Sequence, residues 1–233
     1  MAYQAVFRRR ELKYLITPDQ RDTVLAAMAP HMAPDPYGRT TVRNIYFDTP
    51  DYRLIRRSIE RPVYKEKLRL RAYQRATPGS RVFVELKKKY DHVVYKRRLS
   101  LTEAEALDWL CGRMHCGDHS QIAREIDYFL SFYEGLRPTV FLSYQREAYH
   151  YGDFRVTFDE DVLCRQDHVS LEAEIGGTPI LPPGKILMEI KCAGAIPLWM
   201  TEVLTRQRIF RTSFSKYGTA YQNLIFKGDN IYA

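Results

Sequence analysis

The segments Val84-Glu85-Leu86-Lys87 and Met188-Glu189-Ile190-Lys191 repeat one pattern far apart in the chain: a carboxylate and a lysine two residues apart, among apolar residues. In a β-strand, residues two apart point to the same side, so both charges share one face and the apolar side chains the other. Arg69-Leu70-Arg71 and Arg155-Val156-Thr157-Phe158-Asp159 show the same alternation. We therefore predict a sheet whose charged face encloses a charged ligand and whose apolar face is covered by other elements.

Length and composition favour one domain that binds anions. The 233 residues, 45% of them hydrophobic, suffice for a core, and no linker divides residues 1–233, so we predict a single domain. A net charge of +8 favours phosphates or other polyanions. Because the chain shows no basic helix or docking motif, we expect no nucleic-acid partner. It has no apolar run of membrane-spanning length and no signal-peptide core, so we expect a cytoplasmic protein with reduced cysteines.

Strand-like segments dominate the chain. Eight runs rich in Val, Ile, Tyr and Phe lie near residues 5–14, 40–48, 62–75, 80–90, 92–99, 138–150, 153–160 and 185–192. Turn residues at Thr77-Pro-Gly-Ser80 and Tyr151-Gly-Asp153 indicate antiparallel hairpins. Since eight strands can close a barrel, we predict an α+β fold: an eight-stranded antiparallel β-barrel tunnel with flanking helices.

Helix starts are also recognisable. Capping boxes at Thr17-Pro18-Asp19-Gln20 and Thr102-Glu103-Ala104-Glu105 open two helices, the first running to about Ala33. Further helices are expected after Ser120, at Pro197 and over residues 212–226. The last of these would carry Ser215 and Lys216 near its start, within reach of a bound phosphate.

Charged residues that alternation assigns to one face come from nearly every predicted strand: Glu11, Lys13, Arg69, Arg71, Glu85, Lys87, Lys89, Lys96, Arg98, Arg146, Arg155, Asp159, Glu189 and Lys191. Burying them unpaired would cost several kcal/mol each, which excludes a closed, dry interior and favours an anion-filled one. A solvated face with cross-strand ion pairs is the alternative for any single strand. For Lys89, Lys96 and Arg98, near strand ends, both readings stay open.

Eight motifs, in order along the chain, resemble the VTC domain, the catalytic polyphosphate polymerase module of the vacuolar transporter chaperone complex, within the triphosphate tunnel metalloenzyme superfamily. The motifs are Glu11-Leu-Lys13-Tyr14, Tyr46-Phe-Asp48-Thr49, Arg69-Leu-Arg71, Val84-Glu85-Leu-Lys87, Ser143-Tyr144-Gln-Arg146, Arg155-Val-Thr-Phe-Asp159, Met188-Glu189-Ile-Lys191 and Ser215-Lys216-Tyr217. The resemblance covers the chain from about Arg8 to Leu224.

The resemblance implies roles for individual residues. The groups expected to contact phosphates are Lys13, Arg69, Arg71, Lys87, Arg146, Arg155, Lys191 and Lys216. Further substrate contacts are expected at Glu11, Glu85, Lys96, Tyr144, Asp159 and Ser215, and Glu189 is expected to hold Mn²⁺ or Mg²⁺. Glu85 could be a second metal ligand or pair with Lys87 or an arginine, and Tyr144 could donate to a phosphate or simply pack.

The chain departs from the superfamily at its start. Many tunnel enzymes begin with Glu-x-Glu-x-Lys, whereas this chain reads Arg9-Arg10-Glu11-Leu12-Lys13 and lacks the first acid. We predict a polymerase that moves the γ-phosphoryl group of ATP onto a polyphosphate chain. The alternatives are a metal-dependent triphosphatase, with Glu11 or Glu85 orienting water, and a non-catalytic polyphosphate sensor. A membrane partner would have to be encoded separately.

Overall fold

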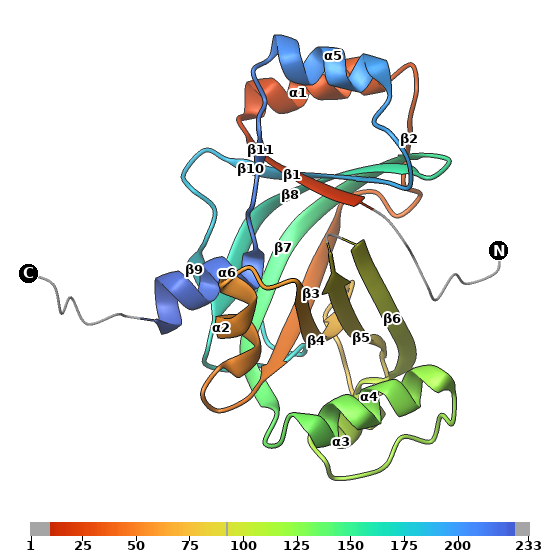
Figure 1. The fold of residues 1–233 in the computed structure, drawn as a ribbon, viewed down its shortest axis with the longest axis vertical. Helices are drawn as coiled ribbons and strands as arrows, with labels where there is room; N and C mark the ends of the chain where they lie inside the picture. The colour runs from red at the N-terminus through yellow and green to blue at the C-terminus, as the bar shows by residue number, and fades with distance from the viewer. Residues whose placement is uncertain (1–9, 92, 227–233) are drawn as a thin grey trace, which may run out of the picture.

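The computed structural model describes residues 10–91 and 93–226. It shows a mixed α+β fold built on one antiparallel sheet (Figure 1). The strands are β1 (Arg10–Ile16), β2 (Ala33–Pro34), β3 (Thr40–Asp48), β4 (Tyr64–Ala72), β5 (Arg81–Tyr90), β6 (Val93–Thr102), β7 (Arg137–Tyr151), β8 (Phe154–Arg165), β9 (Thr178–Pro179), β10 (Ile186–Cys192) and β11 (Arg211–Thr212). The helices are α1 (Pro18–Met28), α2 (Arg53–Ile59), α3 (Glu103–Leu110), α4 (Gln121–Phe132), α5 (Leu198–Arg206) and α6 (Lys216–Ala220), the last continued by a π-helical turn (Tyr221–Ile225).

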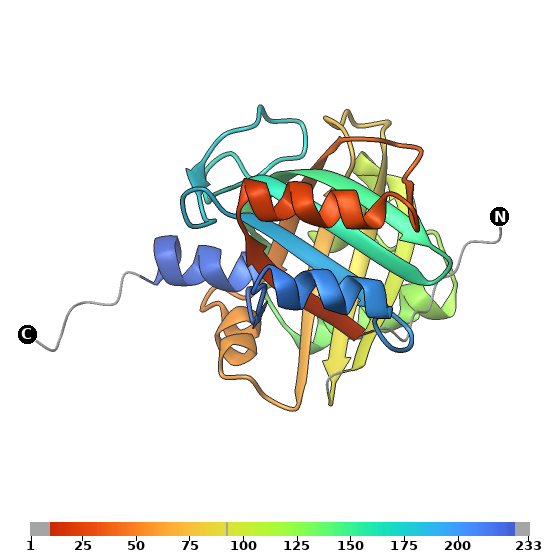
Figure 2. The ribbon, with the colours of Figure 1, turned by 90° about the horizontal axis from the view of Figure 1, so that it is seen from above.

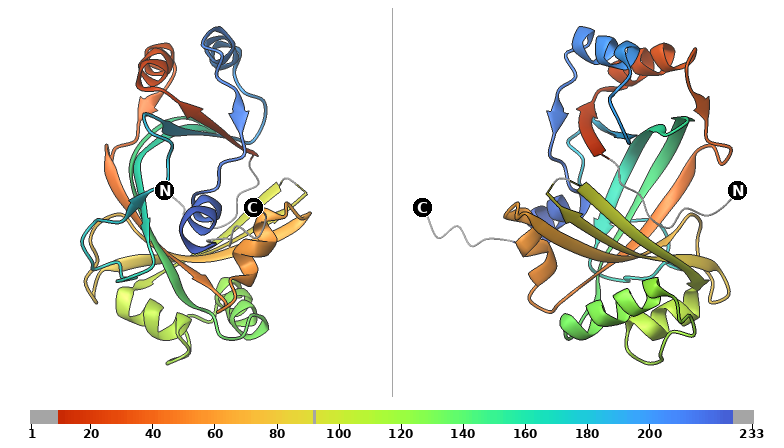
Figure 3. Two further views of the ribbon diagram at one scale, coloured as in Figure 1. Left: turned by 90° about the vertical axis from the view of Figure 1, so that its left-hand side faces the viewer. Right: turned by 45° about the vertical axis from the view of Figure 1, so that its right-hand side comes forward.

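The sheet follows the order β11-β1-β10-β8-β7-β3-β4-β5-β6, with β2 beside β7 and β9 beside β8. It curls, so that β1 comes near β6 (Figure 3). Within the described ranges, strand pairing does not join these two ends, so the predicted closed barrel is not confirmed. Each of the eight predicted runs does contain a long strand of the sheet, although residues 5–9 and 92 of those runs lie outside the described part.

Two separate helix layers, each made of two helices, cover different parts of the apolar face of the sheet. Helices α1 and α5 lie side by side across β10 and β8 (Figure 2), where Val24 and Met200 pack against Met188. Helix α3 packs on β5 and β6 and helix α4 on β6, where Trp109 and Ile126 join a core cluster with leucines and valines of the sheet. A fully buried Leu, Ile or Met contributes about 1.5–3 kcal/mol of hydrophobic stabilisation. The predicted covering of the apolar face is therefore confirmed.

The predicted helix starts are found where their caps were read. Thr17 and Gln20 form the capping box of α1, and Thr102 and Glu105 that of α3. Helix α1 nevertheless ends at Met28 instead of near Ala33, because Pro30 has no backbone N–H to donate to the next carbonyl of the helix.

Two other helical segments differ from the prediction. Helix α2 was not predicted, because no capping side chain stands at its start in the sequence. Its N-terminus is instead capped by Asp48, whose carboxylate accepts from the backbone N–H groups of Leu54 and Ile55. The predicted helix over residues 212–226 starts later, with Ser215 as its N-cap and a strand residue at Thr212. No helix among the described residues has the length and apolar character needed to cross a bilayer.

Candidate functional site

Alternation places the predicted charged residues on the face of the sheet opposite the α1/α5 and α3/α4 layers, here called the inner face. Hydrogen bonds and ion pairs sort these residues into two carboxylate-centred clusters. The Glu85 cluster consists of Glu85, Arg69, Arg71, Lys96 and Arg98. The Glu189 cluster consists of Glu189, Asp159, Lys13, Arg146, Lys191 and Lys216.

Glu85 is fully buried in the middle of β5 and is surrounded by cations from β4 and β6. Arg69 Nε donates to it at 2.7 Å, Lys96 Nζ lies 2.7 Å away, and Arg98 donates through both Nε and an amino group. Burial would raise the pKa of Glu85, but the surrounding cations outweigh it and hold the pKa well below its ordinary value. Glu85 therefore pairs with arginines, as one of the two sequence readings had it, while Lys87 pairs elsewhere.

The arginines of this cluster are fixed by neutral groups as well. Arg71 Nε donates to Asn44 Oδ1 at 2.9 Å, and an Arg71 amino group donates to the Tyr144 hydroxyl at 3.0 Å. Arg69 also reaches the Tyr46 hydroxyl at 3.3 Å. Both guanidinium groups are thus preorganised before any ligand arrives, which lowers the entropic cost of binding an anion.

Tyr144 does more than pack. Besides accepting from Arg71, its ring lies 5.0 Å from the Arg146 guanidinium carbon and 4.6 Å from Lys216 Nζ, within the range of cation–π contacts. This tyrosine therefore joins the two clusters.

Lys216 holds together the two carboxylates of the Glu189 cluster. Its Nζ lies 2.5 Å from Asp159 Oδ2 and 3.1 Å from Glu189 Oε1. Arg146 makes a bidentate bond to Asp159, at 2.5 and 2.7 Å. Burial would lower the pKa of Lys216, but the two carboxylates outweigh that effect and raise it. Lys216 is therefore a permanent cation at the junction of β8, β10 and α6.

The same cluster contains two more lysines. Lys191 Nζ lies 2.9 Å from Glu189, and Lys13 Nζ donates to the backbone oxygen of Phe214 at 2.8 Å while staying 3.7 Å from Glu189. Burial lowers the pKa of Lys13 and of Lys191, with Glu189 opposing it in both cases. Burial thus destabilises the charged form of these two lysines. A phosphate beside them would stabilise that charged form, so binding an anion here is favourable.

Helix α6 delivers Lys216 through its neighbour Tyr217. The Tyr217 hydroxyl donates to Asp48 Oδ2 at 2.9 Å, and its ring stacks on Tyr46 at 4.5 Å. Asp48 is fully buried and also caps α2, so α2 and α6 are tied to the same carboxylate. In the Tyr46-Phe-Asp48 motif, Tyr46 therefore lies on the inner face opposite Arg69, and the buried Asp48 holds α2 and α6 in place.

Glu11 links two opposite sides of the curled sheet. Lys87 Nζ on β5 lies 2.7 Å from Glu11 Oε2 on β1, and no ladder of hydrogen bonds joins those strands in the described part of the chain. Burial would raise the pKa of Glu11, but Lys87 and Lys191 lower it to about 2. An ion pair thus joins β1 to β5, two strands that are far apart in the order of the sheet.

Two further predicted residues, Arg155 and Ser215, have partners that lie outside both clusters. Arg155 stands opposite Lys191 in the β8–β10 ladder, but its guanidinium donates to Asp35 at 2.8 Å and its side chain is 39% exposed. Ser215 caps α6, and its hydroxyl accepts from Lys67 Nζ at 3.1 Å. The phosphate contacts assigned to these two residues stay predictions.

Lys67 itself is an inner-face residue that the sequence interpretation missed. It continues the alternation of Arg69 and Arg71 toward the start of β4, and that alternation was the signal for it. Lys96 and Arg98, left open between surface and interior, belong to the interior by their contacts with Glu85.

This site suits a divalent metal only when substrate phosphates supply part of its coordination. The described residues hold no group of three His, Cys, Asp or Glu side chains arranged to bind an ion. Glu189 and Asp159, held by the one Lys216, supply two carboxylates. Mg²⁺ and Mn²⁺ are commonly bound by one or two carboxylates together with substrate phosphates, so the donor set suits a metal–triphosphate complex.

Two solved structures share this fold. An adenylate cyclase candidate from Bacillus halodurans matches with a TM-score of 0.59 and 15% identity, covering 91% of this chain and 96% of that one. An adenylyl cyclase candidate from Hippeastrum, described as having a dominant triphosphatase activity, matches with a TM-score of 0.54 and 14% identity, covering 93% and 95% of the two chains. The chain therefore shares the fold of these two proteins.

The particular family follows from the sequence. The model of the VTC domain matches residues 8–225, nearly the whole chain, and the protein belongs to that family. A search of curated proteins finds no match. The resemblance inferred from eight motifs is therefore confirmed.

Proposed function

We propose that the protein is a polyphosphate polymerase that transfers the γ-phosphoryl group of ATP to the end of an inorganic polyphosphate chain. The inner face would be enclosed as a tunnel by the edges that the Glu11–Lys87 ion pair brings together. The observation that carries the proposal is the gathering of basic side chains from five strands and α6 around two buried carboxylate centres, a surplus of cations that only a polyanion would balance.

The chemistry needs little from the protein beyond position and charge. The bond between the γ-phosphorus and the oxygen that bridges it to ADP breaks, ADP leaves with the electron pair, and a terminal oxygen of the chain forms the new bond to phosphorus. Because that acceptor oxygen is already anionic, no general base has to remove a proton. Arg69 and Arg71 would hold phosphate oxygens in fixed geometry, and Lys191 and Lys216 would stabilise the charge that develops in transfer.

A metal bound with the nucleotide would neutralise further phosphate charge. Glu189 would hold it, with Asp159 beside it, and both carboxylates already lie within reach of Lys216.

The carboxylates are poorly suited to hydrolysis. A general base works best with a pKa near the working pH. Glu11 has a pKa lowered to about 2 and is engaged by Lys87, and the pKa of Glu85 lies well below its ordinary value among cations that occupy both its oxygens. Neither is a good base for water, which favours phosphate over water as the acceptor.

The test is incubation of the pure protein with ATP, Mn²⁺ and a trace of pyrophosphate, followed by gel separation of chains from free phosphate. Long chains and ADP are expected. Free phosphate without chains would replace the proposal by the triphosphatase, and tight triphosphate binding without turnover would replace it by the sensor.

The variants Arg69→Ala and Lys191→Ala test by ligand binding, without reference to the reaction, whether these residues lie on the inner face. Both should lose tripolyphosphate binding while circular dichroism shows a folded protein. Arg97→Ala is the matched control, since Arg97 alternates with Lys96 and Arg98 on β6 but pairs with Glu125 on α4. Normal binding by both inner-face variants would refute the assignment.

A further inference from the structure

One stretch of the inner face has cations without carboxylates. In the β4–β5 ladder, Lys65 stands directly opposite Lys89, and Lys67 directly opposite Lys87. Like charges in directly opposed positions destabilise a sheet, and two such pairs follow one another here. Only Lys87 has a carboxylate partner among the described residues, Glu11.

Of the other three lysines, Lys65 and Lys67 donate to neutral groups. Lys67 Nζ donates to the Ser215 hydroxyl at 3.1 Å, and Lys65 Nζ donates to the Ser58 backbone oxygen at 3.0 Å. No carboxylate within the described chain forms an ion pair with Lys65, Lys67 or Lys89. Burial, reinforced by surrounding lysines, lowers the pKa of Lys67 well below its ordinary value, and burial beside Lys89 lowers that of Lys65.

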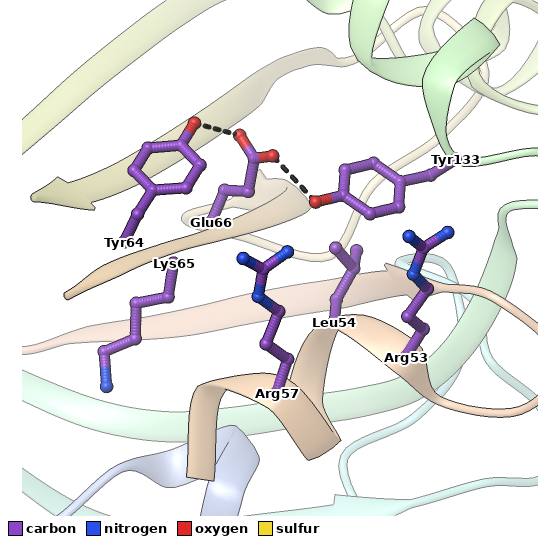
Figure 4. Close-up of a pocket in the computed structure, with 7 residues that line it drawn as sticks. All are labelled: Arg53, Leu54, Arg57, Tyr64, Lys65, Glu66 and Tyr133. Atoms are coloured by element: carbon purple, nitrogen blue, oxygen red, sulfur yellow. Dashed lines mark hydrogen bonds between the residues drawn. The ribbon is translucent and has the colours of Figure 1, made fainter. Parts of the chain in front are cut away.

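The nearest acid in sequence does not relieve these charges. Figure 4 shows the pocket between α2 and β4, in which Glu66 accepts hydrogen bonds from the hydroxyls of Tyr64 (2.6 Å) and Tyr133 (2.9 Å). Lys65, the residue before it, points away from this carboxylate, as alternation along a strand requires. Glu66 therefore serves the outer face, and the lysines of the inner face remain uncompensated.

The lysines extend the arginine row of the Glu85 cluster in one direction. Lys65, Lys67, Arg69 and Arg71 occupy successive inner positions of β4. With about 3.3 Å per residue, the row spans roughly 20 Å. A row of that length suits an extended polyanion better than a single compact anion. Its Lys65 end lies beside α2, so the row runs from the Glu85 cluster to that end of the sheet.

We propose that Lys65, Lys67 and Lys89 form a chain-binding subsite that holds the phosphates of a polyphosphate remote from the reacting end. The subsite deepens the proposed function and rests on it. Lys67 lies nearest the reaction centre, since Ser215 and Lys216 are adjacent, and Lys65 and Lys89 bind the phosphates farther along the chain. The repulsion between the lysines is relieved when the chain lies among them.

The test compares two ligands by calorimetric titration: tripolyphosphate, and a linear polyphosphate of several tens of phosphates. Lys65→Ala/Lys89→Ala should lose at least tenfold in affinity for the long chain, a change of about 1.4 kcal/mol or more. Its affinity for tripolyphosphate should change less than about twofold, because no remote phosphates are present. Lys88→Ala is the matched control, since it lies between two inner lysines on β5 but faces Glu125.

Thermal unfolding without ligand gives a second readout. Because the variant removes like-charge repulsion, it should melt at a higher temperature than the parent protein, whereas loss of a merely structural lysine would lower the melting temperature. Unchanged long-chain affinity, or equal losses for both ligands, would refute the subsite while leaving the polymerase intact. If the parent protein bound neither ligand, the proposed function would fall, and the subsite with it.

Discussion

The two carboxylate-centred clusters face the same interior but are built differently. In the Glu85 cluster one buried carboxylate holds cations that have no other acid partner in the described chain. In the Glu189 cluster, Arg146 and Lys216 keep Asp159 as a second partner if Glu189 is removed. Arginines predominate in the first and lysines in the second. The first therefore has the character of a fixed frame, and the second that of a centre whose charges can be redistributed around a ligand.

The largest expected effect follows from this difference. Glu85→Ala leaves four cations facing a buried empty space and should cost about 3–5 kcal/mol of unfolding free energy. Glu189→Ala should cost less, about 1.5–3 kcal/mol, because Asp159 still pairs with Lys216. Thermal unfolding measures both, and Glu85→Ala should melt roughly 10 °C lower than the parent protein.

Tripolyphosphate should restore much of the stability of Glu85→Ala, because phosphate oxygens can replace the missing carboxylate. Equal stability losses in the two variants, with no rescue, would mean that the clusters do not differ in the way described.

A smaller effect concerns pH. Burial lowers the pKa of Lys96 to about 7, against the opposing influence of Glu85, and Arg71 and Arg98 overcome burial to lower the pKa of Tyr73 to about 7. As pH rises through about 7, Lys96 loses its charge and Tyr73 becomes anionic, so the affinity for tripolyphosphate should fall. Titrations at several pH values test this, and Lys96→Met/Tyr73→Phe should show a flatter profile.

The stability of the unliganded protein should change with pH in the opposite direction. The folded-state pKa of Lys96, about 7, lies below its unfolded value of 10.5, so the unfolded chain binds more protons between these values. Stability from this group therefore rises with pH across that window. A melting temperature that fell between pH 7 and 9 in the parent protein but not in Lys96→Met would contradict the assignment.

The smallest expected effect is at Arg155, the predicted phosphate contact that lies apart from both clusters. Its ion pair with Asp35 is partly exposed, so Arg155→Ala should cost less than about 1 kcal/mol of stability. Tripolyphosphate affinity should change far less than in Arg69→Ala. A loss as large as that of Arg69→Ala would show that Arg155 leaves Asp35 to contact phosphate directly.

Much of this architecture could be predicted because alternation is a local property. The alternating charges of β4, β5 and β10 predicted which face of the sheet is charged and that other elements cover the opposite face. Lys67 and Lys65 follow the same rule and could have been found by extending it. The partners could not, because they depend on which strands meet: Glu85 accepts from both neighbouring strands, and Glu11 meets Lys87 from the opposite edge.

Helix α2 shows the same limit. Its cap is the side chain of Asp48, which lies outside the local window in which a capping residue is normally sought. The hydroxyl of Tyr217, far along the chain, donates a hydrogen bond to the same carboxylate. Local patterns therefore predicted α1, α3 and α4, whose caps stand at their own starts, and missed α2, whose N-terminus is bound by a side chain several residues upstream.

The pairing of β1 with β10 also has a consequence for how the chain folds during synthesis. Strand β1 ends at Ile16 and its partner begins at Ile186, so about 170 residues must be made before the pair can form. At bacterial and eukaryotic elongation rates this takes on the order of 10 to 30 s. Throughout that time β1 is an unpaired strand with apolar Leu12 and Tyr14, and its alternating Glu11 and Lys13 discourage association with other nascent chains. The charges that later serve the interior are thus positioned to protect the newborn polypeptide from aggregation.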